Sequence, residues 1–177
     1  MYVLQDIYIE TEDGRGAHID FIVITEKITF FIECKNLVGN IDIDSKGNFV
    51  RTVTYGRKKY KEGIYSPITQ NERHMEIVKE SKLENRNLLT GMIVRKSFHS
   101  FNRSLVVLAN PKTVLNDRYA KKEVKEKVIR ADQLITTIKK IVAESRMPSL
   151  SKKEMKEFAE SFLKKNQGNR KNYIEKY

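Results

Sequence analysis

One stretch of the chain, HIDFIVITEKITFFIECK at positions 18–35, limits the fold more than any other part of the sequence. Two nearly continuous apolar runs rich in β-branched and aromatic residues flank Glu26 and Lys27, and this pattern predicts a β-hairpin with a two-residue turn. A turn centred between these two residues fixes the register of the strands. In that register Asp20 lies opposite Glu33, so the sequence predicts two carboxylates side by side on one face of a sheet.

Opposed carboxylates are an unfavourable choice for structure alone. Directly opposed residues of an antiparallel pair have Cβ atoms about 4.5–5.5 Å apart, and like charges at that distance repel. A divalent cation between them removes the repulsion. Glu33 and Lys35 are two positions apart and project from the same face, whereas Cys34 points to the opposite face and the core. The hairpin is thus predicted to gather Asp20, Glu33 and Lys35 into one patch.

The composition of this patch suits the hydrolysis of phosphodiesters. Mg²⁺ prefers hard oxygen ligands and uses one or two protein carboxylates, with water and substrate phosphate completing its shell. A nearby lysine stabilises the charge that develops on the phosphate or positions the attacking water. The alternative is that Asp20, Glu33 and Lys35 are solvated charges at strand ends, since this spacing often arises by chance. Their apolar flanks argue against that alternative, because an ionised group there is costly.

Several strings around the patch resemble those of a known family. Asp20, Glu33 and Lys35 resemble the D…(D/E)xK signature of the PD-(D/E)XK nuclease superfamily. The wider context is similar to the nuclease-related domain branch of that superfamily. The similar strings are IDFIVI, FFIECKNLVGNI, SPITQNERH, SLVVLAN and VIRADQLITTIKKI. Together they span most of residues 1–145 and are more specific than the three charged residues alone.

The resemblance implies an α/β fold of the restriction-endonuclease-like type, with a central mixed β-sheet flanked by helices. It also implies a metal-dependent nuclease that cleaves DNA with a metal-activated water. The metal, Mg²⁺ with Mn²⁺ as a substitute, would be held by Asp20, Glu33 and the main-chain carbonyl of Cys34. Lys35 would be the catalytic lysine, and Gln70, on a helix, would reach the site.

The start of the chain departs from the family pattern. Members of this branch usually carry a helix with an additional acidic residue before the first strand, whereas this sequence enters almost at once into the strand-like YVLQDIYI. Glu10, at the end of that strand, is the candidate for the additional metal ligand. Three interpretations stay open: the sequence is shortened at its start, the domain works with fewer ligands, or it is a non-catalytic nucleic-acid-binding module that retains the fold.

The charge of the chain favours DNA as the partner. The net charge is +11 and the pI is near 9.6, and Lys and Arg side chains bind polyanions by releasing counterions from phosphates. The most basic segment is YGRKKYK at 55–61, with the cations Arg57, Lys58, Lys59 and Lys61. Two tyrosines among these cations suit stacking on the bases of a single strand. A solvated loop is the equally weighted alternative.

Helices are predicted on either side of the later strands. The segment 66–89 opens with Ser-Pro, which is typical of a helix start. Ser151 with Glu154 forms a capping-box pattern for a last helix. We therefore predict one nuclease-like domain over 1–145, with the helix and basic tail of 146–177 docked on it. A homodimer contact through that last helix is the alternative to docking.

The cysteine content and the hydropathy of the sequence indicate the cellular compartment of the protein. Cys34 is the single cysteine of the sequence, which excludes an internal disulfide and a cysteine-based zinc site. A reducing compartment is therefore predicted, and the cytoplasm of a bacterium suits it. No apolar stretch approaches the roughly 20 residues that a membrane-spanning helix needs, so no membrane partner is predicted.

Overall fold

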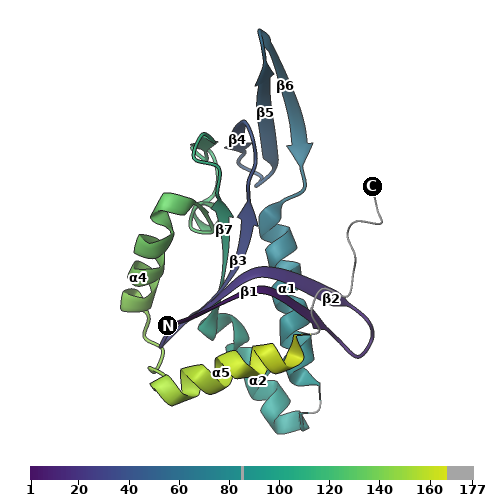
Figure 1. The fold of residues 1–177 in the computed structure, drawn as a ribbon, viewed down its shortest axis with the longest axis vertical. Helices are drawn as coiled ribbons and strands as arrows, with labels where there is room; N and C mark the ends of the chain where they lie inside the picture. Colours follow the sequence, from purple (N-terminus) through teal and green to yellow (C-terminus); the bar gives the residue numbers. More distant parts are fainter. Residues whose placement is uncertain (85, 167–177) are drawn as a thin grey trace. The chain divides into compact units, whose positions relative to one another are not determined.

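Residues 1–84 and 86–166 are described by a computed structural model, in which the chain divides into two units. The first unit contains Met1–Phe31, Arg73–Arg103 and the described chain from Ser145 onward, and the second contains Ile32–Glu72 and Ser104–Glu144. Three elements continue from one unit into the other, namely β3 (Thr29–Lys35), α1 (Pro67–Leu83) and β7 (Asn102–Leu108) (Figure 1). Each unit has its own core.

An antiparallel hairpin forms the sheet of the first unit. Strand β1 (Tyr2–Glu10) pairs with β2 (Gly16–Ile24), and β2 is followed in the sheet by the first residues of β3. The turn from β2 to β3 lies where the sequence predicts it. The backbone N–H of Thr25 donates to the carbonyl oxygen of Ile28 at 3.1 Å, and the Thr25 hydroxyl donates to the same oxygen at 2.7 Å. Glu26 and Lys27 are therefore the two turn residues.

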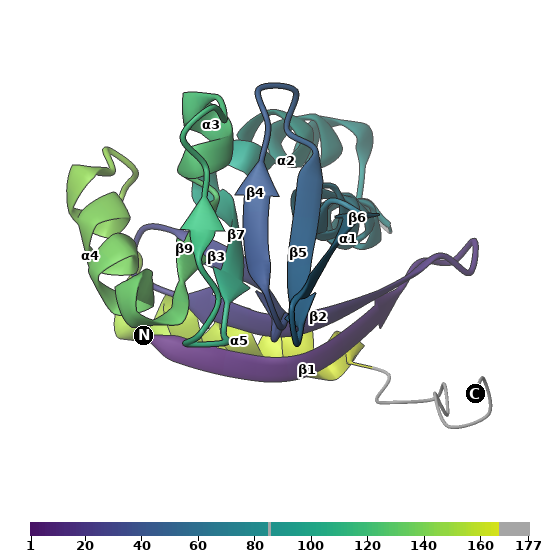
Figure 2. The ribbon, with the colours of Figure 1, turned by 90° about the horizontal axis from the view of Figure 1, so that it is seen from above.

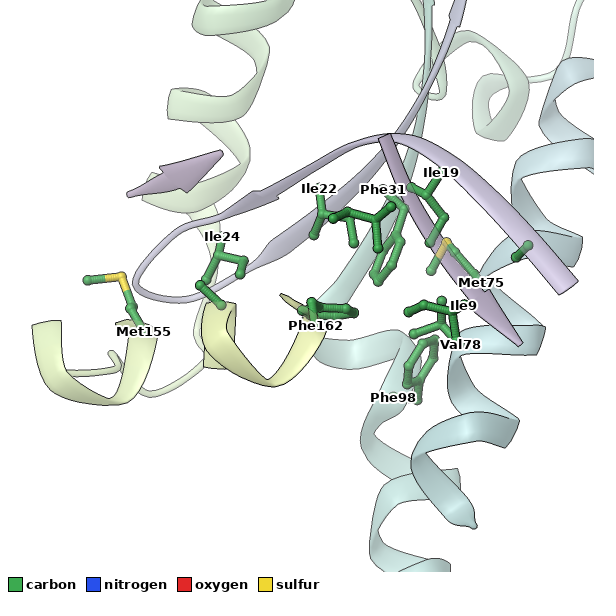
Figure 3. Packing of buried hydrophobic residues seen from close by; sticks show 13 residues of the cluster. Ile9, Ile19, Ile22, Ile24, Phe31, Met75, Val78, Phe98, Met155 and Phe162 are labelled. Carbon is green, nitrogen blue, oxygen red and sulfur yellow. The ribbon is translucent and has the colours of Figure 1, made fainter. Parts of the chain in front are cut away.

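Helices close the core of the first unit against this hairpin. They are α2 (Leu88–Phe101), α5 (Lys152–Lys165) and the part of α1 from Arg73 on. The ring of Phe31 lies at the centre, with its centroid 6.4 Å from that of Phe98 and 6.1 Å from that of Phe162 (Figure 3). Burial of each such side chain contributes roughly 1.5–3 kcal/mol, so these rings hold helices from distant parts of the sequence on β3.

The helix predicted over 66–89 is in fact two helices. Its start is as predicted, because the hydroxyl of Ser66 accepts the backbone N–H of Thr69 at 3.3 Å. The helix α1 ends at Leu83, however, and α2 begins at Leu88 with Asn87 as its N-cap. The Asn87 side chain accepts the Thr90 backbone N–H at 2.9 Å, which satisfies one of the unpaired donors at a helix start.

A mixed four-stranded sheet belongs to the second unit. Its strand order is β6-β5-β4-β8, with β4 antiparallel to β5 and parallel to β8. The bounds are Asn40–Ile43 for β4, Phe49–Tyr55 for β5, Lys58–Ile64 for β6 and Leu115–Asn116 for β8. Strand β7 pairs in parallel with β9 (Val128–Arg130) in the same unit (Figure 2). These two strands belong to the five-stranded sheet of order β1-β2-β3-β7-β9, in which β3 is the neighbour of β7.

The core of the second unit contains residues of β4, β5, β7 and β9 and of the start of α1. Its buried members are Ile41, Ile43, Phe49, Ile68, Val106, Leu108, Ala120 and Val128. The helical segments are α3 (Lys122–Lys125), the 3₁₀ turn η1 (Ala131–Gln133) and α4 (Leu134–Glu144). Parallel and antiparallel pairing with helices in both units makes this an α/β fold of the restriction-endonuclease-like class, as the sequence predicts.

The last helix, α5, begins with the predicted capping box. The Ser151 hydroxyl accepts the Glu154 backbone N–H, and the Glu154 carboxylate accepts the Ser151 backbone N–H at 2.8 Å. Met155, Ala159 and Phe162 are buried in the core of the first unit. The basic tail predicted after this helix, from residue 167 on, lies outside the described residues. Within the described chain, no helix combines the length and the apolar character that crossing a bilayer requires.

Candidate active site

The end of β3 holds a buried carboxylate and a lysine on one face. Glu33 is 3% exposed, and its Oε1 lies 2.6 Å from the Nζ of Lys35. Residues two apart on a strand share a face, so the alternation along FFIECK places the side chains of Glu33 and Lys35 on the same face of β3. An isolated buried carboxylate is costly, so the ammonium of Lys35 offsets the desolvation of Glu33.

Gln70 reaches the same lysine from the first turn of α1. Its side-chain Oε1 accepts a hydrogen bond from Lys35 Nζ at 3.0 Å. The Ser66 cap and Pro67 set where the helix begins, and the Gln70 backbone N–H donates to the Ser66 carbonyl at 3.0 Å. The second unit therefore brings together Glu33, Lys35 and Gln70, which the sequence predicts as site residues, although their roles stay predictions.

Neighbouring contacts hold this arrangement in place. The Lys35 carbonyl accepts the backbone N–H of Ala109 at 3.0 Å, so the end of β3 is bonded to the chain after β7. Asn71, beside Gln70, is fully buried, and its amide donates to Ser104 Oγ at 2.8 Å. The same amide donates to the Leu105 carbonyl at 3.2 Å. Asn71 thus anchors α1 on β7 and fixes where Gln70 points.

Asp20 lies in the first unit, on β2, with its side chain 28% exposed. The Nδ1 of His18 is 3.9 Å from Asp20 Oδ1, and the Nε2 of His18 contacts Asp6 Oδ1. The opposition of Asp20 to Glu33 stays a prediction that rests on the turn at Glu26 and Lys27. His18, two residues before Asp20, shares its face as alternation predicts.

Asp6 is a residue that the sequence patterns do not single out. Its φ of 56° is in the left-handed region, which is rare for a residue other than glycine. The regular pairing of β1 with β2 is interrupted there, between Gln5 opposite Phe21 and Ile7 opposite Ile19. The register is the same on both sides of the interruption, so no residue is inserted as in a β-bulge, and Asp6 is matched along the strands by Asp20. The available signal in the sequence is one acidic residue inside the apolar string LQDIYI.

Glu10, the predicted additional ligand, ends β1 in the first unit. It is half-buried, and its Oε2 accepts a hydrogen bond from the Tyr8 hydroxyl at 3.4 Å. Tyr8 in turn lies opposite His18 in the β1–β2 pairing. Glu10 therefore lies on the same hairpin as Asp20, and its role as a ligand stays a prediction.

The donor set fits a hard divalent cation. In the part of the chain that the structure describes, no three His, Cys, Asp or Glu side chains form a metal-binding group. Mg²⁺ does not need three, because it commonly takes one or two carboxylates and keeps several waters. The Glu33 carboxylate, the Cys34 main-chain carbonyl and the Asp20 carboxylate supply oxygen donors of the kind that Mg²⁺ prefers.

The predicted basic segment is a strand, not a loop. Arg57 follows Gly56 in the turn between β5 and β6, and Lys58, Lys59 and Lys61 lie on β6, all exposed. Strand β4 pairs with β5 only as far as Thr52, so the outer half of β5 pairs with β6 alone (Figure 1). The outer part of the β5–β6 hairpin is called the basic ribbon below. It comprises residues 53–61.

Two aromatic rings lie on one side of the basic ribbon. The rings of Tyr55 and Tyr60 are 6.0 Å apart between centroids with an interplanar angle of 63°, and both side chains are exposed. Alternation along β6 places Lys58 with Tyr60 on this side and Lys59 with Lys61 on the other. The ribbon therefore presents cations on both faces and aromatic surface on one.

The α/β fold with its mixed sheets is of the restriction-endonuclease-like class. The chain matches the family model of the nuclease-related domain over residues 1–109, which is more than half of its length. The protein belongs to the nuclease-related domain family. No curated protein and no solved structure matches the chain.

Proposed function

We propose that the protein is a metal-dependent nuclease that hydrolyses DNA phosphodiester bonds. The observation that carries the proposal is the position of Lys35, whose ammonium lies 2.6 Å from the Glu33 carboxylate and 3.0 Å from the Gln70 amide oxygen. The buried carboxylate and the amide hold the ammonium of Lys35 in place before any substrate binds. Charges fixed in this way stabilise the charge that develops in a transition state. Membership of the nuclease-related domain family supports the same chemistry.

The proposed metal ligands are the side chains of Asp20 and Glu33 and the carbonyl of Cys34, with Glu10 as an additional ligand. Mg²⁺ is the proposed ion, and Mn²⁺ can replace it. When bound, the ion polarises the scissile phosphate and lowers the pKa of a coordinated water. The residues of the chain supply the rest of the site.

Lys35 is the proposed catalytic lysine. Its ammonium stabilises the charge that develops on a non-bridging phosphate oxygen as the attacking water forms the new bond to phosphorus. The bond from phosphorus to one bridging oxygen breaks, the attacking water releases a proton to solvent, and the leaving oxygen takes up a proton from solvent. Gln70 fixes the rotamer of Lys35 through its amide oxygen and can donate from its amide nitrogen to water or phosphate.

DNA is the proposed substrate because the chain is strongly basic. The net charge of +11 favours a polyanion, and the exposed cations of the basic ribbon offer a surface for phosphates. The paired rings of Tyr55 and Tyr60 add a platform on which bases can stack.

Cleavage of plasmid, linear duplex and single-stranded DNA in Mg²⁺ or Mn²⁺ tests the proposal. We expect the wild type to cut and Lys35→Ala to cut at least about 100-fold more slowly, as when one stabilising group is removed from an active site. The matched control is Lys112→Ala, which removes an exposed lysine of the same unit. Equal rates in Lys35→Ala and the wild type would contradict the assigned role of Lys35.

The same assay separates the alternative function. If the wild type does not cut with either metal but binds DNA with an affinity that falls steeply with salt, the protein is a non-catalytic nucleic-acid-binding module. A homodimer through α5 is tested separately by the mass of the protein in solution.

A further inference from the structure

A cavity in the first unit is lined by cations from α1, α5 and the segment after α1. Its volume is about 120 Å³. The charged residues that line it are Lys82, Arg86 and Lys165, and the polar residues Ser81 and Ser161 also belong to the lining. No acidic side chain is among the described residues that line it. The remaining wall is apolar and contains Ile9, Val78, Phe158 and Phe162.

Two of the three cations are held in place by hydrogen bonds. Lys165 Nζ donates to the Ser81 hydroxyl at 2.9 Å and to the Ser81 carbonyl. Arg86 Nε donates to the Lys82 carbonyl at 2.7 Å. These bonds use oxygens that carry no formal charge, and among residues 1–84 and 86–166 no carboxylate forms an ion pair with Arg86 or Lys165. The cavity therefore concentrates positive charge on side chains whose positions are already set.

Lys82 is the third cation and the least solvated of them. Its Nζ lies 3.8 Å from the centroid of the Phe158 ring and 4.5 Å from that of Phe162. In the described part of the chain no carboxylate pairs with it. Burial, and after it the positive charges of Arg86 and Lys165, together lower the pKa of Lys82 to about 7.

The aromatic rings alone do not account for the cluster. A cation over two ring faces gains on the order of 1–2 kcal/mol when it is desolvated, which explains why Lys82 tolerates its place. It does not explain why Arg86 and Lys165 line the same cavity, because like charges repel. An anion in the cavity would pair with all three and restore the charged form of Lys82.

We propose that this cavity binds a phosphate-class oxyanion, either inorganic phosphate or a terminal phosphate of a nucleic acid. A guanidinium and two ammonium groups are donors suited to the oxygens of such an anion. The cavity is smaller than the roughly 300–1,000 Å³ of pockets that enclose drug-sized ligands, so it accommodates a single small group. The proposal is independent of the proposed cleavage of DNA.

Thermal unfolding in added sulfate or phosphate, at constant ionic strength, tests the proposal. A ligand that binds the folded state raises the melting temperature in a saturable way. We expect this response in the wild type and at least about tenfold weaker binding in Lys82→Met and Lys165→Met, because each loses a charge-assisted contact. The matched control is Lys164→Met, which removes an exposed lysine outside the cavity and should respond as the wild type does.

A second property of the variants excludes loss of folding as the cause. In buffer without oxyanions, Lys82→Met should melt at the temperature of the wild type or above it, because it removes an uncompensated charge and keeps the apolar contacts with Phe158 and Phe162. Lys82→Arg keeps the charge and should retain part of the response. No response in the wild type, or an equal response in all the variants, would overturn the proposal.

Two oligonucleotides of one sequence distinguish a terminal phosphate of a nucleic acid from inorganic phosphate as the ligand. If a terminal phosphate enters the cavity, the 5′-phosphorylated form binds the wild type more tightly than the 5′-hydroxyl form, and Lys82→Met abolishes the difference. If the two forms bind equally while inorganic phosphate still raises the melting temperature, the ligand is the free anion. Both results support the cavity as an oxyanion site, and neither depends on cleavage.

Discussion

Lys35 is the residue on which the proposed chemistry rests. Its ammonium has two acceptors in the second unit, the buried carboxylate of Glu33 and the amide oxygen of Gln70. Glu33 compensates the charge of Lys35, whereas Gln70 restricts the direction in which the ammonium points. Removal of Glu33 or of Gln70 should therefore affect the rate of cleavage differently from removal of Lys35 itself.

Substitution of Gln70→Ala should lower the rate of cleavage about tenfold and leave DNA affinity unchanged. The lost hydrogen bond to a charged group corresponds to roughly 1.5–3 kcal/mol, part of which Lys35 recovers through its contact with Glu33. Single-turnover cleavage and anisotropy measure the two quantities. Thr69→Ala, an exposed neighbour in the same turn of α1, is the control. Full activity in Gln70→Ala would show that the amide does not position the lysine.

Lys82 should make the free energy of unfolding depend on pH. Its pKa is about 7 in the folded protein and 10.5 in the unfolded chain, so between these values the unfolded state binds more protons. Stability therefore rises with pH across this window, and the cost of the buried charge is fully present below pH 7. In oxyanion-free buffer, Lys82→Met should be more stable than the wild type at pH 6, by a margin that shrinks toward pH 10. With Lys164→Met the difference from the wild type should not change with pH.

Among the elements, the basic ribbon is the one that extends past its sheet. Beyond Thr52, strand β5 pairs only with β6, and the side chains of the ribbon are exposed except that of Val53. Arg51 and Glu62, nearer the base, form an ion pair, whereas the sequence of the ribbon contains no acidic residue. This leaves the cations on the outer part available for phosphates.

Replacement of Lys58, Lys59 and Lys61 by Gln should weaken DNA binding and reduce its dependence on salt. Each phosphate contact contributes a slope of about 0.9 in the plot of log affinity against log salt for duplex DNA, so the slope should fall by up to about 3. The control replaces Lys121, Lys122 and Lys125, which are exposed lysines of the same unit around α3. Equal slopes in the two triple variants would exclude the ribbon as a binding element.

Gly39, between β3 and β4, should tolerate no side chain. Its φ is +99°, and a Cβ there would lie 2.4 Å from the Thr52 carbonyl oxygen. We expect Gly39→Ala to cost about 2–4 kcal/mol of unfolding free energy, from strain and displacement of β5. Gly63→Ala, on the exposed strand β6 with open space around its Cβ, should change stability by less than about 1 kcal/mol. Urea unfolding of both variants measures the difference.

In the whole molecule, the features that the sequence predicts are those set by a few adjacent residues. The turn at Glu26 and Lys27, the cap at Ser66 and the capping box at Ser151 each depend on a few adjacent residues, and the structure has all three. The α/β class followed from the same signals and from the resemblance to nuclease-related domains. The contact of Gln70 with Lys35 agrees with the expectation that Gln70 reaches the site.

Features that depend on distant parts of the chain were not predictable in this way. The left-handed backbone of Asp6 lies where the pairing of β1 with β2 is interrupted, and no local pattern predicts that interruption. The break between α1 and α2 contains no proline or glycine, and Asn87 becomes a cap only once α2 packs Phe98 into the core. The division into two units likewise combines three separate stretches of sequence in the first.

Calorimetric titration with Mn²⁺ measures whether Asp20 and Glu33 hold a catalytic ion. We expect one site in the wild type and in the control Asp132→Asn, which changes an exposed acid on η1. We expect at least about tenfold weaker binding in Asp20→Asn and in Glu33→Gln, because each removes a carboxylate ligand. Unchanged Mn²⁺ affinity in both variants, or no binding by the wild type, would show that these two carboxylates do not hold the ion.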